Sequence, residues 1–127
     1  MITIKDFIVT NNPLVRDEFD NIVFVQGSYH DVLVKVRDFV HSGHELINHP
    51  LGASIRMLFS PYRSIFMGDK TNTHNEYFIE TVENSIENYN KHMEVRKPDT
   101  DNSSDYAIID KELLISAMKE YKSLKQL

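Results

Sequence analysis

Cysteine is absent from this chain of 127 residues. Its absence excludes a disulfide scaffold, a thiolate metal site and a cysteine nucleophile. Long apolar runs are missing too, because none approaches the roughly 20 residues that span a bilayer. The N-terminus also lacks a basic leader followed by an apolar core. We therefore expect a cytoplasmic protein with neither a signal peptide nor a membrane span.

Positive charge is in deficit. The chain has 14 lysines and arginines against 19 aspartates and glutamates, which gives a formal net charge of −5. Such a balance gives no bulk electrostatic support to nucleic-acid binding. The hydrophobic share of 41% and the charged share of 26% are ordinary for a globular protein. Folding at this length buries roughly two thirds of the surface of the unfolded chain. We predict a single domain over residues 1–127.

The first half of the chain alternates apolar runs with helical patterns. Three short runs rich in β-branched and aromatic residues predict strands, at residues 7–9, 22–25 and 45–48. A helix over 13–19, with Pro13 at its first position, is predicted between the first two strands. A longer helix is predicted to begin after Ser28, which forms a capping-box pattern with Asp31, and to end before Gly43.

The middle of the chain is predicted to hold one strand and one long helix. A long loop over residues 50–62 leads to a fourth strand at 63–67. Apolar residues at steps of three and four then predict a helix over 75–96. A polar stretch at 97–104, rich in helix-breaking residues, predicts a mobile linker within the domain.

The end of the chain completes the predicted fold. A short apolar run at 106–109 predicts an edge strand, and Asp110 is placed to cap a final helix. Alternation of strands and helices favours parallel pairing with right-handed crossovers. We therefore predict an α/β fold with a three-layer, mostly parallel, four- to five-stranded Rossmann-like sheet and C-terminal helices.

Polar loops follow the predicted strands, and in a parallel sheet ligands bind at the carboxyl ends of the strands. A pocket at this edge would gather amide, hydroxyl, imidazole and guanidinium groups suited to a small anionic metabolite. The candidate ligand-binding residues are Asn11, Asn12, Ser28, His49, Ser54, Arg56 and Arg63. The competing interpretation is that these side chains cap helices and satisfy loop backbone groups.

Histidine offers one candidate for chemistry. His49 is either a general base or a side chain that bonds its own loop. A metal site shared by His44 and His49 is disfavoured, because the strand between them would separate the two by roughly 16 Å. Gly27 alone makes neither a dinucleotide fingerprint nor a phosphate loop, and no hydrolase-type serine elbow occurs. We expect no metal and no cofactor.

Several sequence blocks follow one another between residues 10 and 65. They are Thr10–Val15, Gly27 with Asp31–Asp38, Gly43–His44, His49–Leu51, Ser54 and Ser60–Ile65. Together they resemble the GrdX family, small proteins encoded with the clostridial glycine, sarcosine and betaine reductase systems. The resemblance covers residues 4–67 well and the helical remainder in outline.

The resemblance implies an accessory component of a selenium- and thiol-dependent amino-acid reductase pathway in the cytoplasm of anaerobes, with no catalytic residues to carry over. Our favoured hypothesis is a non-catalytic accessory or regulatory protein that binds a small anionic metabolite or a reductase component. The alternative is a small enzyme in which His49 is the acid/base and Arg56 or Arg63 holds a carboxylate or phosphate. A second copy of the chain is a further candidate partner, because the apolar stripe of the 75–96 helix could also dimerise.

Overall fold

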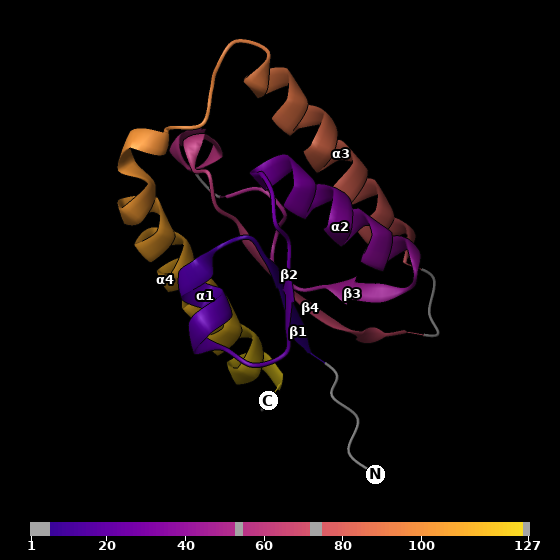
Figure 1. The fold of residues 1–127 in the computed structure, drawn as a ribbon. Helices are drawn as coiled ribbons and strands as arrows, with labels where there is room; N and C mark the ends of the chain where they lie inside the picture. The colour runs from indigo at the N-terminus through magenta and orange to yellow at the C-terminus, as the bar shows by residue number, and fades with distance from the viewer. Residues whose placement is uncertain (1–5, 53–54, 72–74, 126–127) are drawn as a thin grey trace.

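A computed structural model describes residues 6–52, 55–71 and 75–125. Strands and helices alternate along these ranges, and the sheet lies between two groups of helices (Figure 1). The elements are β1 (Phe7–Thr10), α1 (Pro13–Glu18), β2 (Ile22–Phe24), α2 (Tyr29–His41), β3 (His44–Leu46), the 3-10 helix η1 (Ile55–Phe59), β4 (Ser64–Lys70), α3 (Glu76–Met93), the 3-10 helix η2 (Thr100–Asn102) and α4 (Ser103–Lys125).

Local capping interactions begin and end the first two helices. The Asn12 side chain accepts a hydrogen bond from the Leu14 backbone N–H, and Pro13 occupies the first turn of α1. At α2 the predicted capping box is confirmed, since Ser28 and Asp31 each accept the other's backbone N–H. Gly43 follows α2 with φ at +105°, a conformation that glycine adopts most readily.

The sheet has the strand order β2-β1-β4-β3. β1 pairs with β2 in parallel, whereas β4 runs antiparallel to both β1 and β3. An α/β fold with a four-stranded sheet is confirmed, but the mostly parallel Rossmann-like pairing is wrong. The physical reason is the return of the chain after β3. It reaches Ser64 at the same end of the sheet where β3 stops, so β4 must run back between β1 and β3.

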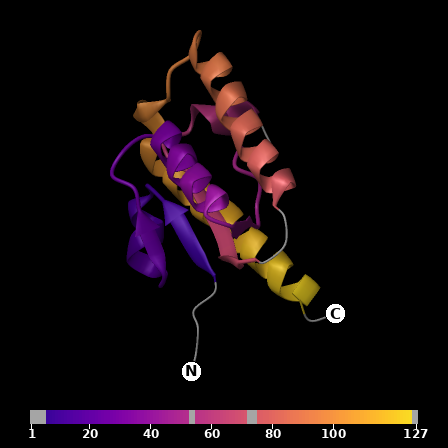
Figure 2. The ribbon, with the colours of Figure 1, turned by 90° about the vertical axis from the view of Figure 1, so that its right-hand side faces the viewer.

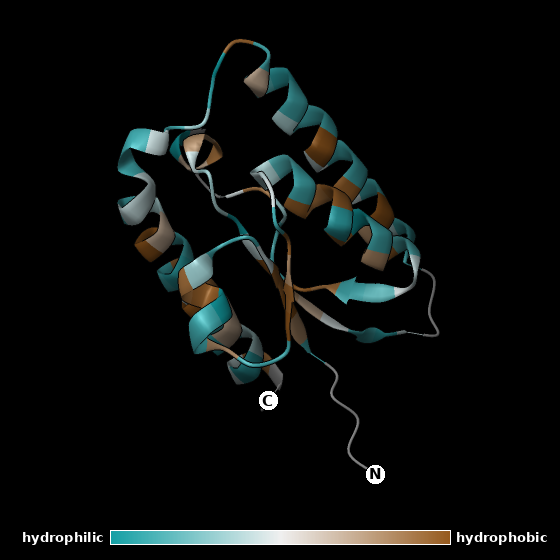
Figure 3. Ribbon diagram, viewed as in Figure 1, coloured by the Kyte–Doolittle hydropathy of each residue, from teal (hydrophilic) through white to brown (hydrophobic). Residues whose placement is uncertain are grey.

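Helices cover both faces of the sheet. Adjacent strand residues point to opposite faces, so Val9 and Ile65 pack with α2 and α3, whereas Ile8 and Phe66 pack with α1 and α4. The Leu114 side chain of α4, 1% exposed, joins the second cluster. Many of the hydrophobic residues, coloured brown in Figure 3, lie on the central strands and on α2 and α3. Two apolar interiors, one on each face, therefore hold the sheet in place.

The C-terminal part of the chain differs from the prediction. The expected edge strand at 106–109 lies inside α4, where Ala107 is buried while Ile108 and Ile109 are exposed. Asp110 is consequently no helix cap, and it lies buried in the second turn of α4. The expected linker at 97–104 contains η2 and the first residues of α4. None of the helices in the described ranges is both long enough and apolar enough to cross a membrane.

Candidate functional site

The carboxyl ends of β1, β2 and β3 and the start of β4 meet at one end of the sheet, because β4 runs opposite to the other three strands. Asn11 follows β1, Ser28 comes after β2, His49 comes after β3 and Arg63 precedes β4. Most of the predicted ligand-binding residues therefore belong to one end of the fold. Their hydrogen bonds decide what each can do there.

Asn11 connects three chain segments. Its side-chain nitrogen donates to the carbonyls of Gly27 at 2.9 Å and Pro61 at 2.8 Å. Its side-chain oxygen accepts the backbone N–H of Arg63 at 2.9 Å. The side chain is 5% exposed, and these three bonds use one acceptor and both donors. Asn11 thus holds the loops after β1 and β2 to the chain entering β4.

Asn12 links α1 to α4. Beyond capping α1, it donates from its side-chain nitrogen to the Ala107 carbonyl and to Asp110 Oδ2, both at 2.9 Å. Asp110 also accepts the Ser64 backbone N–H at 2.9 Å and the Ser64 hydroxyl at 2.7 Å. Asp110 is 0% exposed, so α4 delivers a fully buried carboxylate to the start of β4.

Asp110 was missed as a functional or structural centre by the sequence reasoning. A signal was present, since Ala107, Asp110 and Leu114 lie at steps of three and four, on the face that α4 buries. A carboxylate in an apolar helix stripe predicts a buried hydrogen-bonded charge. The predicted strand at 106–109 hid this periodicity.

Arg63 shapes the loop after β3. Its Nε donates to the Pro50 carbonyl at 2.8 Å, and its Nη2 donates to the carbonyls of His49 and, at 3.5 Å, Leu51. Its Nη1 lies 4.0 Å from Asp110 Oδ1, and the side chain is 7% exposed. The guanidinium is therefore surrounded by backbone carbonyls and a buried carboxylate. This arrangement fixes residues 49–51 in place and leaves little of Arg63 facing solvent.

The remaining candidate residues lie at the surface or outside the described ranges. The Ser28 hydroxyl is used in the capping box of α2. Ser54 lies outside the described residues. Arg56 is exposed on η1 and borders a hollow of about 370 Å³. The other residues lining this hollow are Met57, Asp99, Asn102, Asp105, Tyr106 and Ile109.

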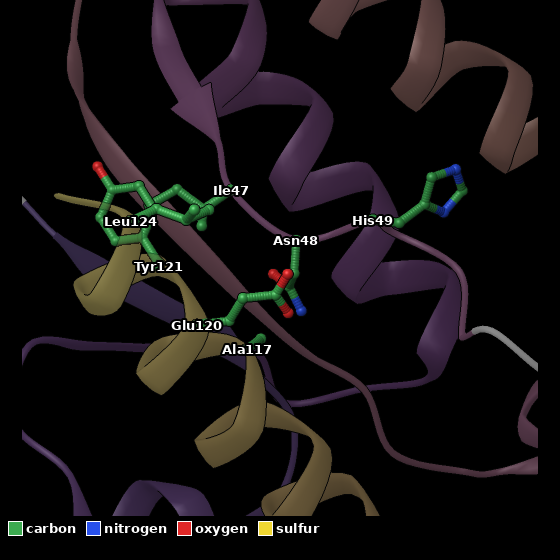
Figure 4. A pocket seen from close by; sticks show the side chains of 7 residues that line it. All are labelled: Ile47, Asn48, His49, Ala117, Glu120, Tyr121 and Leu124. Carbon is green, nitrogen blue, oxygen red and sulfur yellow. The ribbon is translucent and has the colours of Figure 1, made fainter. Parts of the chain in front are cut away.

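His49 is exposed and bonded to its own loop. Its Nδ1 lies 3.1 Å from the Leu51 backbone nitrogen and 3.3 Å from the Leu51 carbonyl oxygen. The ring borders two hollows beside β3, of about 300 and 220 Å³. In the larger one, Figure 4 shows His49 turned away from the residues of α4. Neither of these hollows is lined by Asn11, so neither brings His49 together with this other candidate ligand-binding residue.

Two stacked tyrosines pack beneath the loop that follows β3, and one of them hydrogen-bonds to it. The ring centroids of Tyr29 on α2 and Tyr89 on α3 lie 4.7 Å apart. The Tyr29 hydroxyl accepts the Gly52 backbone N–H at 3.3 Å and lies 3.4 Å from the Pro50 carbonyl. Burial raises the pKa of Tyr29, and the nearby charge of Arg63 opposes this shift. Burial raises the pKa of Tyr89 to about 12.

Comparison with known proteins finds a matching family model. A family model described as GrdX-like protein matches residues 7–119 of the chain. Curated proteins give no match, and neither do solved structures. In the part of the chain that the structure describes, no group of three or more histidine, aspartate or glutamate side chains could hold a metal ion.

Proposed function

Because the chain belongs to the GrdX-like protein family, we propose that it is an accessory or regulatory component of the glycine, sarcosine and betaine reductase pathway. In this proposal it acts by binding a partner through the loops at the carboxyl ends of β1, β2 and β3. The favoured partner is a reductase component, and a small anionic metabolite is the second candidate ligand. The function is binding, and the chemistry belongs to other proteins of the pathway.

The observation that carries the proposal is the set of hydrogen bonds made by Asn11 and Arg63. Asn11 holds Gly27 and Pro61, while Arg63 holds the carbonyls of residues 49–51. Loops from three parts of the chain are thereby fixed relative to one another. A surface ordered before binding loses less conformational freedom when a partner docks, which favours recognition.

The same hydrogen bonds favour a protein partner over a metabolite. An anion at Arg63 would have to replace bonds to backbone carbonyls and compete with the carboxylate of Asp110. His49 and Arg56 are two of the polar side chains that are exposed at this end. Exposed groups on an ordered loop surface suit contact with another protein.

Binding to purified reductase components tests the proposal. The chain would be immobilised and each component passed over it, with the affinity measured by biolayer interferometry. The double variant His49→Ala/Arg56→Ala should weaken binding of one component by about tenfold or more, since it removes exposed contacts without touching the hydrogen bonds of Arg63 and Asn11. The matched control is Arg37→Ala/His41→Ala, which removes the same two residue types near the C-terminal end of α2, at the opposite end of the sheet.

Equal affinity of the two double variants for every component would contradict binding through the strand-end loops. A thermal-shift series with glycine, sarcosine, betaine, acetyl phosphate and inorganic phosphate tests the metabolite arm. A ligand at 100 times its dissociation constant adds about 2.7 kcal/mol of stability, which raises the melting temperature by several degrees. Such a rise, lost in Arg56→Ala, would favour the metabolite instead of the protein partner.

A further inference from the structure

β3 forms one edge of the sheet, and its outer side carries backbone groups that pair with no strand in the described part of the chain. The Gly43 carbonyl accepts the Thr71 N–H, and the Ile47 N–H donates to the Phe66 carbonyl, so both residues direct backbone groups toward β4. In an antiparallel pair this direction alternates along the strand. The backbone groups of His44 and Leu46 therefore point away from β4.

Side chains keep the edge extended past Leu46. The Asn48 side-chain oxygen accepts the Phe66 backbone N–H at 2.6 Å, in the place where a further backbone pair would form. Toward the start of β3, the register between β3 and β4 shifts between His44 and Leu46. At this shift the Gly68 carbonyl accepts a hydrogen bond from His44 Nδ1 at 2.9 Å. Residues 44–48 thus lie along β4 and present one continuous outer edge.

A hollow flanks this edge on each face of the sheet. On the α4 side, about 300 Å³ is lined by Ile47, Asn48, His49, Ala117, Glu120, Tyr121 and Leu124 (Figure 4). On the α3 side, about 220 Å³ is lined by Leu46, Ile47, Asn48, His49, Tyr77, Phe78 and Thr81. Leu124 is 62% exposed and Tyr77 is 76% exposed. Figure 2, the view from the right-hand side of Figure 1, shows α2 and α3 side by side and α4 farther from the viewer.

We propose that the β3 edge binds an extended basic peptide segment of a partner protein, which adds as a further strand beside residues 44–48. Alternate side chains of an added strand point to opposite faces of the sheet. One set would enter the hollow beside α4, where Glu120 is the acidic residue of the lining. The other set would enter the hollow of Leu46, Tyr77 and Phe78. The matching sequence alternates lysine or arginine with an aliphatic residue.

The flanking helices favour a peptide over a second copy of the chain. A strand from a peptide needs a width of about 4.8 Å beside β3. A second copy brings its own α3 and α4 to the same place, so four helices would have to pack as the two strands meet. The negative charge of Glu120, in a chain of net charge −5, also favours a basic segment over another acidic chain. This surface adjoins the loop contacts proposed above, since His49 lines both hollows, but strand addition uses the backbone of residues 44–48.

Peptide binding to the full chain tests the inference. The probe is a fluorescein-labelled peptide of about eight residues that alternates lysine and valine, followed by fluorescence anisotropy up to about 1 mM. Binding should slow hydrogen exchange at the backbone amides of His44 and Leu46. Glu120→Lys should weaken binding by about tenfold or more, because a favourable charge contact becomes repulsive. The control Glu112→Lys makes the same charge change at an exposed site on the same helix.

A second probe separates strand addition from simple charge attraction. It is the same peptide with alternate backbone nitrogens methylated, which removes hydrogen-bond donors and keeps every charge. Loss of binding by the methylated peptide would support strand addition. The inference would be overturned if both peptides bound with equal affinity, or if Glu112→Lys weakened peptide binding as much as Glu120→Lys. It would also be overturned if the unmethylated peptide did not bind at any concentration tested. A dimer in sedimentation that Glu120→Lys disrupts would assign the edge to a second copy instead.

Discussion

Arg63 and Asp110 place two opposite charges in the protein interior, with Nη1 of the arginine 4.0 Å from Oδ1 of the aspartate. Each charge has hydrogen-bond partners of its own. Arg63 donates to loop carbonyls, and Asp110 accepts from Ser64 and Asn12. A buried charge is tolerated when it is paired and hydrogen-bonded, and its removal leaves the opposite charge buried without a partner. The pair therefore acts as a structural joint between α4, β4 and the loop after β3.

We expect Asp110→Ala to destabilise the protein by about 3–5 kcal/mol, because Arg63 then stays buried without a carboxylate and the donors of Ser64 and Asn12 lose their acceptor. Urea unfolding followed by circular dichroism measures the change. Glu112→Ala, at an exposed position two residues further along α4, should change stability by no more than about 0.5 kcal/mol. Similar unfolding midpoints for the two variants would contradict the structural role of Asp110.

Residues whose partners lie nearby in the sequence were predictable. Ser28 and Asp31 are three residues apart, and their capping box follows from that spacing. The main partner of Asp110, Ser64, lies 46 residues away, and no local pattern connects them. The loop position of Asn11 was predictable as well, but its bonds to Gly27 and Pro61 depend on how three segments meet.

At the scale of elements, α2 and α3 pack along one face of the sheet and meet through the stacked rings of Tyr29 and Tyr89, whose planes differ by 20°. Both rings are nearly inaccessible, at 1% and 4% exposure. Ionisation of either ring would place a negative charge inside this helix pair. The packing of two helices is thus coupled to the protonation of their tyrosines.

This coupling predicts a loss of stability at alkaline pH. Tyr89 has a folded-state pKa of about 12, above its usual value of 10.0, so the folded state favours the protonated phenol. The stabilisation is fully present below pH 10.0 and is lost as pH rises toward about 12. Free energies of unfolding in urea across this range, for the wild type and Tyr89→Phe, measure it.

Tyr89→Phe should lose less stability over this pH range than the wild type, because it lacks the ionisable hydroxyl. Tyr77→Phe changes a ring that is 76% exposed and should follow the wild-type curve. Parallel curves for the wild type and Tyr89→Phe would contradict the role of the buried phenol.

Helices were easier to predict than short strands. The stripe at residues 79, 82, 86, 89 and 93 predicted a helix over 75–96, and α3 occupies Glu76–Met93. The run at 106–109 was too short for its period to separate a strand from one turn of a helix. Its neighbours in α4 decide the matter, because Leu114 packs against Ile8 and Phe66.

At the scale of the whole molecule, β4 lies between β1 and β3 and completes the sheet. The apolar run that predicted β4 indicates a buried strand but carries no direction. Direction depends on where the chain returns after β3, which the loop sequence does not encode locally. This is why four strands could be predicted from the sequence while their order and the antiparallel pairing could not.

The interior position of β4, which it shares with β1, predicts hydrogen exchange among the slowest in the molecule at Ile65, Phe66 and Met67, whose side chains are at most 3% exposed. β4 is paired on both sides, so its amides exchange only when the whole domain unfolds. Exchange of residues 64–70, measured by mass spectrometry, should be far slower than that of the edge strand β2. Comparable rates in the two strands would contradict this.

The position of β4 also sets the order of events as the chain leaves the ribosome. β1 and β3 are synthesised first, yet their backbones are joined in the sheet only by β4, which begins at Ser64. Asp110, the acceptor for the Ser64 amide, emerges 46 residues later, roughly 2–9 s at the usual rate of translation. During that interval Arg63 has no buried carboxylate to pair with, and one face of the sheet is not yet covered by α4. The nascent protein therefore gains its complete interior only after α4 has been synthesised.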